Sequence, residues 1–116
     1  MIIRDGEYKI NAIPQMKGGI GQFVTEEMVP PEYLGKAGTL FVRGTLAPGD
    51  SVGMHTHVSN MEVCVFLKGT GLVRDAQEGD VRLGAGDTHI CLPGSAHEII
   101  NDGDEPLVYL AIVLNP

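Results

Sequence analysis

The chain has 116 residues, of which 43% are hydrophobic, and this fits one globular domain with a single core. Its formal net charge of −7 argues against nucleic-acid and anionic-membrane partners, because both bind basic surfaces. No apolar run approaches the roughly 20 residues of a membrane span. The charged and apolar mixture in Met1–Asn11 is unlike a signal peptide, so we expect a cytoplasmic protein.

The first third of the chain shows no regular alternation. With 16 glycines and 7 prolines, the sequence is rich in turn-forming residues and predicts an all-β protein. The only helix candidate covers residues 21–33, and Pro30-Pro31 would cut it short. We interpret residues 1–38 as an N-terminal arm that contributes edge strands or loops and packs on a sheet edge, either its own or a partner's.

Residues 39–116 contain short strand-like runs separated by turn signals. Many short strands at this spacing predict a sandwich or a barrel. The predicted runs are Thr39–Leu46, Met61–Leu67, Gly71–Arg74, Val81–Leu83, Thr88–Leu92, His97–Asn101 and Leu107–Leu114.

Four polar residues in this region form a candidate metal site. His55 and His57 lie two residues apart, so on a strand both imidazoles point to the same side. Glu62 follows after a short polar loop, and His97 begins a later strand, so a closed barrel would bring all four together. Three imidazoles and one carboxylate suit a divalent Mn, Fe, Co, Ni, Cu or Zn ion.

The spacing around these residues resembles that of a known family. The segment GDSVGMHTHVSNMEVCVFLKG, residues 49–69, meets every spacing of the first cupin motif, and residues 86–101 are similar to the second. One departure is Leu92 at the usual proline position, with Pro93 following it. The resemblance implies a single-domain cupin with a double-stranded β-helix, or jelly-roll barrel. It also implies that His55, His57, Glu62 and His97 bind one divalent metal ion.

Alternation along the strands predicts the walls of a substrate pocket. Residues that share a face with Glu62 or with His97 should also point into the barrel. On the second motif, two positions that are usually aliphatic in the family carry a histidine and a cysteine. The predicted pocket residues are therefore Cys64, Phe66, His89, Cys91 and Ile99.

His89 is the candidate catalytic residue among them. It could shuttle protons, donate a hydrogen bond to substrate or support a metal ligand, or its ring could simply bind a backbone carbonyl. Cys64 and Cys91 are too few and too far apart for a disulfide scaffold and are expected to be buried free thiols. Arg43 should lie outside the barrel, on the side available to a subunit contact.

Three functions are compatible with such a site. The first is a metal-dependent dioxygenase or decarboxylase acting on a small carboxylate or oxygenated molecule. The second is a sugar-type isomerase or lyase with a redox-inert metal and His89 as base. The third is a non-catalytic small-ligand-binding protein. Cupins similar to oxalate decarboxylase usually carry an arginine three residues before the first histidine, where this chain has Val52, which argues against that reaction. We also expect a homodimer that covers exposed sheet edges.

Overall fold

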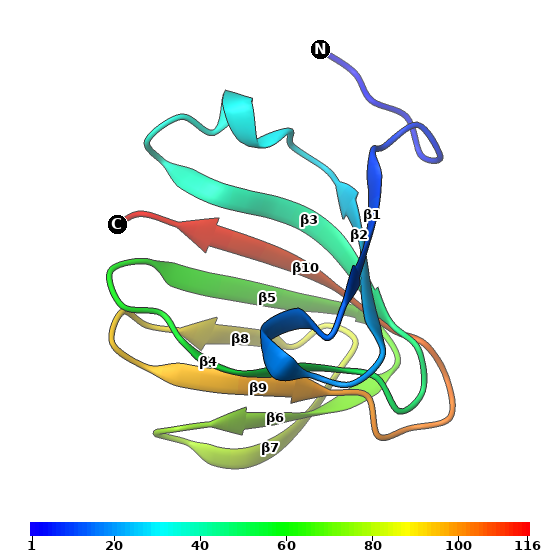
Figure 1. The fold of residues 1–116 in the computed structure, drawn as a ribbon, viewed down its shortest axis with the longest axis vertical. Coiled ribbons are helices and arrows are strands. Elements are labelled where there is room, and N and C mark those ends of the chain that lie inside the picture. Colours follow the sequence, from blue (N-terminus) through cyan, green and yellow to red (C-terminus); the bar gives the residue numbers. More distant parts are fainter.

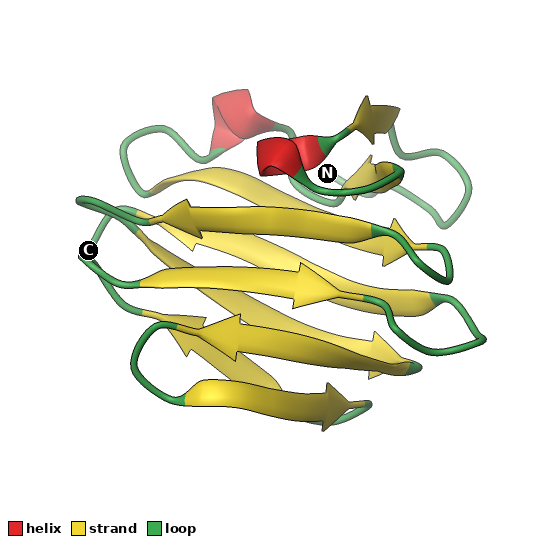
Figure 2. Cartoon of the chain, turned by 60° about the horizontal axis from the view of Figure 1, so that its bottom comes forward, coloured by secondary structure: helices red, strands yellow, loops and turns green.

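The computed structural model describes residues 1–116 as two antiparallel β-sheets that face each other (Figure 1). The larger sheet has six strands in the spatial order β1 (Ile10–Pro14), β2 (Gln22–Glu27), β3 (Gly38–Leu46), β10 (Leu107–Leu114), β5 (Met61–Lys68) and β8 (Thr88–Cys91). The smaller sheet has the order β4 (Ser51–Thr56), β9 (Ala96–Ile100), β6 (Thr70–Asp75) and β7 (Gly79–Gly84). Figure 2 shows one layer of strands lying across the other.

The all-β jelly-roll prediction is confirmed. Each of the predicted strands from Thr39 onward is present, with boundaries that differ by at most two residues, and β4 is additional. Two 3-10 helices, η1 (Met16–Gly18) and η2 (Pro31–Tyr33), are the only helices. No helix is long and apolar enough to cross a membrane.

The helix candidate over residues 21–33 is wrong. Most of its first half is strand β2, in which Phe23 and Thr25 are each 3% exposed while their neighbours face outward. This period of two is set by the neighbouring strand, because β2 pairs with β3 from Phe23↔Leu46 to Glu27↔Val42. In a short polar segment, pairing with a neighbouring strand determines the secondary structure more than the segment's own helix or strand propensity does.

Strand β10 organises the core. It lies between β3 and β5, with Ala111 opposite Val42 on one side and Cys64 on the other. Every second residue of β10 is buried, as expected for a strand with one face on the core. A cluster of 11 buried apolar residues fills the space between the sheets: Phe23, Val42, Leu46, Val52, Cys64, Phe66, Val73, Ile99, Leu107, Tyr109 and Ala111.

The N-terminal segment extends the larger sheet beyond β3. Strand β2 pairs with β3, and β1 pairs with β2 and forms the sheet edge. Arg43 lies outside the barrel on β3, where its guanidinium contacts Glu26 at 2.9 Å and Asp5 at 2.7 Å. These ion pairs tie the segment to the sheet within one chain. The homodimer remains a prediction.

Candidate metal centre

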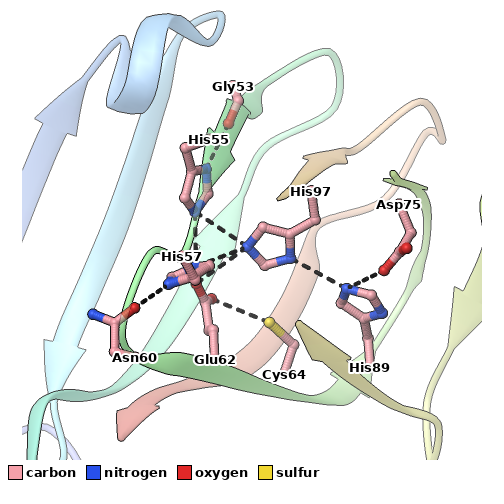
Figure 3. Close-up of polar contacts among 9 residues, drawn as sticks. All are labelled: Gly53, His55, His57, Asn60, Glu62, Cys64, Asp75, His89 and His97. Atoms are coloured by element: carbon pink, nitrogen blue, oxygen red, sulfur yellow. Dashed lines mark hydrogen bonds and ion pairs between the residues drawn. The ribbon is translucent and has the colours of Figure 1, made fainter. Parts of the chain in front are cut away.

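The four candidate ligands come from both sheets. His55 lies in β4 and His97 in β9, and the register of these paired strands puts the two residues directly opposite each other. His57 follows the last residue of β4, and its backbone N–H donates to the carbonyl of Ser95 just before β9. Glu62 is the second residue of β5 in the larger sheet. The candidate centre therefore lies between the sheets, where only the closed barrel assembles it (Figure 3).

The spacing of the ligand atoms fits one metal ion. Oε1 of Glu62 lies 3.0 Å from Nε2 of His57, 3.3 Å from Nε2 of His97 and 3.7 Å from Nε2 of His55. Nε2 of His97 lies 3.1 Å from that of His55 and 3.2 Å from that of His57. With metal–ligand bonds of about 2.1 Å, neighbouring ligand atoms are about 3.0 Å apart in octahedral and about 3.4 Å apart in tetrahedral sites. The four groups could therefore hold a divalent ion.

Hydrogen bonds outside the cluster select the ring tautomers of two histidines. Nδ1 of His55 donates to the backbone carbonyl of Gly53 at 2.7 Å, and Nδ1 of His57 donates to Oδ1 of Asn60 at 2.8 Å. Because both partners are acceptors, each neutral ring carries its proton on Nδ1 and presents the lone pair of Nε2 to the centre. This is the form in which imidazole binds a metal.

Glu62 is a buried carboxylate that stays ionised. Burial raises the pKa of Glu62, but hydrogen bonds from the protonated rings of His55, His57 and His97 outweigh it and hold that pKa well below its usual range. The Cys64 thiol donates to Oε2 of Glu62 at 3.1 Å, and burial keeps the pKa of this thiol well above its usual value. The Glu62 hydrogen bond also raises the pKa of His57, against burial and the positive charge of Lys17. An ionised carboxylate buried among imidazoles favours a cation at their centre.

His89 lies behind His97, away from the other ligands (Figure 3). Its Nε2 is 3.2 Å from Nδ1 of His97 and 3.5 Å from Oδ2 of Asp75. A metal bound at Nε2 of His97 requires the ring proton on Nδ1, and Nε2 of His89 is placed to accept it. Burial lowers the pKa of His89, and the charge of His97 acts in the same direction, which favours the neutral ring.

This contact predicts a role for His89 in orienting His97. Supporting hydrogen bonds of this kind typically change metal affinity by about 10- to 100-fold. We expect His89→Leu to weaken metal affinity by about that factor, and His89→Gln, which retains an acceptor, to remain close to wild type. Metal titration monitored by calorimetry would measure both variants. Equal affinity in His89→Leu and wild type would contradict the role.

A cavity of about 420 Å³ lies beside the centre, with His55, His57 and Glu62 on its wall. This volume is in the range of small-molecule sites. Tyr109 borders the cavity and its ring lies 5.5 Å from Phe23, which also borders it. The other lining residues are Met16, Lys17, Thr39, Leu40, Val52, Thr56, Val58, Ser59, Asn60, Ala111 and Val113. The cavity wall therefore combines the polar side chains of the candidate ligands with apolar side chains.

The five residues predicted to line the pocket lie elsewhere in the barrel. Cys64, Phe66, Cys91 and Ile99 are each at most 1% exposed, and none borders the cavity. They face inward, but three of them lie farther along the strands than Glu62 and His97, and all four pack into the closed interior. His89 is also absent from the cavity wall, because His97 lies between it and the other ligands.

Several residues of the site were not predicted from the sequence. Met16 and Lys17 come from the N-terminal segment, and no local pattern relates them to the histidines. Asn60 and the carbonyl of Gly53 fix ring tautomers, and Asp75 lies 3.5 Å from His89. Asn60 had one available signal, since it lies three residues after His57 in a tight connection.

Comparisons with known proteins agree with this architecture. The cupin domain family, Cupin_2, matches residues 42–113. A protein of Thermotoga maritima described as an oxalate-binding protein is 33% identical over 114 residues, covering 98% of this chain and 93% of that protein. A crystal structure from Thermotoga maritima, described as a predicted oxalate decarboxylase, is 33% identical, covers 100% of both chains and has a TM-score of 0.93.

More distant structures share the fold alone. KdgF from Halomonas sp. is 12% identical, with a TM-score of 0.78 over 100% of this chain and 95% of its own. The family match covers more than half of the chain, and it includes all four candidate ligands. The protein belongs to the cupin domain family.

Proposed function

We propose that this protein binds a divalent metal ion through His55, His57, Glu62 and His97 and uses it to hold a small carboxylate in the adjacent cavity. The observation that carries the proposal is the convergence of four ligand atoms, all within 4.8 Å of one another, beside a cavity of about 420 Å³ whose wall includes His55, His57 and Glu62. A bound divalent ion with free coordination positions supplies a Lewis acid for carboxylate oxygens.

The descriptions of the relatives support a small carboxylate as the ligand. Oxalate is named in the descriptions of the Thermotoga maritima relative and of the Thermotoga maritima crystal structure, each 33% identical to this chain. Oxalate is a small dianion whose two carboxylates can bind one metal ion together. We therefore choose oxalate as the first ligand to test.

The protein's own side chains would bind and orient such a ligand. Asn60 and Ser59 supply polar groups near the histidines, and Tyr109 and Val113 supply apolar surface that excludes water. Glu62 is already surrounded by imidazoles and by the Cys64 thiol, which leaves it little freedom to accept a proton from the ligand. The cavity wall is thus better suited to binding a ligand than to transferring a proton to or from it.

A second candidate function is decarboxylation or oxygenation of the bound acid. The related crystal structure described as a predicted oxalate decarboxylase supports it. Apart from the candidate metal ligands, the ionisable side chains on the cavity wall are Lys17 and Tyr109. Because His89 lies away from the cavity, the structure gives no support to the isomerase alternative that required it as a base. Carbon dioxide release and oxygen consumption with oxalate would measure this second function.

Metal removal tests the proposed function directly. We expect oxalate to bind the metal-loaded protein, to lose measurable binding after the metal is stripped with a chelator, and to regain it after reloading. Isothermal titration calorimetry would measure binding, with 1,2-propanediol as an uncharged comparison ligand. Equal oxalate affinity with and without metal, or no binding to the metal-loaded protein, would contradict the proposal.

A further inference from the structure

The cavity contains one fixed positive charge. Among its lining residues, Lys17 is the only lysine or arginine, in a chain whose net charge is −7. Lys17 is exposed, and no carboxylate lies within ion-pair distance of its ammonium group, whereas Arg43, Arg74 and Arg82 are all paired. A lysine without a carboxylate partner at the wall of a ligand cavity is free to bind an anion.

The turn that carries Lys17 is fixed to the strand that carries His55. The backbone N–H of Ile20 donates to the Ser51 hydroxyl at 2.9 Å, and the Ser51 N–H donates to the Ile20 carbonyl at 2.9 Å. These bonds attach the segment after η1 to the first residue of β4. Figure 1 shows η1 in the connection between β1 and β2, beside β4.

Two glycines allow the close approach of these backbones. A Cβ on Gly53 would collide with the carbonyl oxygen of Lys17, and a Cβ on Gly19 would collide with the carbonyl oxygen of Ser51. The carbonyl of Gly53 also accepts the hydrogen bond from Nδ1 of His55. The backbone of Lys17 is therefore packed directly on the residue that orients a candidate metal ligand.

The conformation of the turn is also specific. Gln15 and Lys17 both have left-handed backbone conformations, with φ of 48° and 54°, which residues other than glycine rarely adopt. Met16, between them, packs on the hydrophobic core. With the core holding Met16 and β4 holding the segment behind it, the Lys17 side chain is held at the cavity wall. Strained backbone of this kind is concentrated at functional sites.

We infer that Lys17 is the anion-binding residue of the cavity and binds a carboxylate of the ligand. This inference rests on the proposed function, and it supplies from the N-terminal segment the cation that is absent from β4, where Val52 stands three residues before His55. Val52 is 5% exposed and belongs to the hydrophobic core, so that position offers no charge to the ligand.

The test is oxalate binding by matched variants, each loaded with the metal that the wild type retains. Lys17→Met should weaken oxalate affinity about tenfold, the effect of losing one charge-assisted hydrogen bond. Lys17→Arg should stay close to wild type. Lys68→Met, the same change at the far end of β5 from Glu62, should have no effect. All variants should retain the wild-type metal content, because Lys17 is not a ligand.

The outcomes separate the two proposals. If the wild type binds oxalate and Lys17→Met binds it equally well with the same metal content, the inference is overturned and the proposed function stands. If the metal-loaded wild type binds no oxalate, both fail. A loss of metal from Lys17→Met would also contradict the inference, because it would assign Lys17 to the metal centre. Thermal unfolding followed by circular dichroism would verify that each variant is folded.

Discussion

Replacing His97 with alanine is expected to abolish metal binding by the folded protein. His97 is 0% exposed, and its Nε2 lies between 3.1 and 3.3 Å from ligand atoms of the other three residues, so it is the most central of the four. Its removal leaves an open ligand position inside the barrel that no neighbouring side chain fills. We expect metal content to fall from about one ion per chain to less than about a tenth of that. Elemental analysis of the purified protein would measure it.

Ile99→Ala is the matched control for His97→Ala. Ile99 lies two residues farther along β9, points to the same side and is 1% exposed, but it is not a ligand. This variant should lose stability, by about 2–5 kcal/mol for a buried isoleucine, and keep its metal. A folded His97→Ala protein with full metal content would show that the ligand assignment is wrong.

Replacing Phe66 with alanine is expected to cost about 3–5 kcal/mol of unfolding free energy. The ring is 1% exposed and lies 5.3 Å from the ring of Tyr109, within the core between the two sheets. Such a loss is a large part of the roughly 5–15 kcal/mol that stabilises a typical domain. Urea unfolding at 25 °C, followed by circular dichroism, would measure it. Metal-free protein should be used, so that ligand binding does not add to the stability.

Leu67→Ala provides the comparison on the opposite face of β5. Leu67 is the next residue along the strand and is 44% exposed. Because much of its surface is already in water, its removal should cost less than about 1 kcal/mol. A larger loss for Leu67→Ala than for Phe66→Ala would contradict the register of β5, since a shift of one residue exchanges the two faces.

Much of the barrel could be predicted from the sequence because its strands are bounded by clear turn signals. Strand β10 is an apolar segment that begins directly after the turn that ends at Pro106. Its observed bounds, Leu107–Leu114, equal the predicted ones. The segment from Thr39 to Leu46 ends at a turn containing Pro48 and Gly49, and β3 ends at the same residue. At such positions the turn-forming residues and the tertiary structure place the end of the strand at the same residue.

The edge strands could not be predicted in the same way. Four of the six residues of strand β2 are polar, and its alternation becomes visible only when Phe23 packs on Tyr109 and the backbone pairs with β3. Strand β1 forms the edge of the sheet and pairs only with β2, and it is more exposed still, with Ile10 61% exposed. The information that makes these segments strands lies in their neighbours and not in their own residues.

The candidate ligands could be predicted from the sequence, whereas the cavity wall could not. The ligands follow from motif spacing, because strand alternation and the pairing of His55 with His97 are fixed by the fold. The cavity wall depends on Met16 and Lys17, which reach it through contacts between η1 and β4 that have no signature in spacing. Alternation correctly directs Cys64 and Phe66 inward, but it does not distinguish the open part of a barrel from the packed part.

Anomalous X-ray scattering from crystals of the metal-loaded protein would show whether the four candidate ligands hold the ion. Data collected above and below the absorption edge of the metal found by elemental analysis would locate the ion. We expect one peak, within about 2.0–2.3 Å of Nε2 of His55, His57 and His97 and of a carboxylate oxygen of Glu62. An ion bound elsewhere on the chain, with no peak among these four side chains, would contradict it.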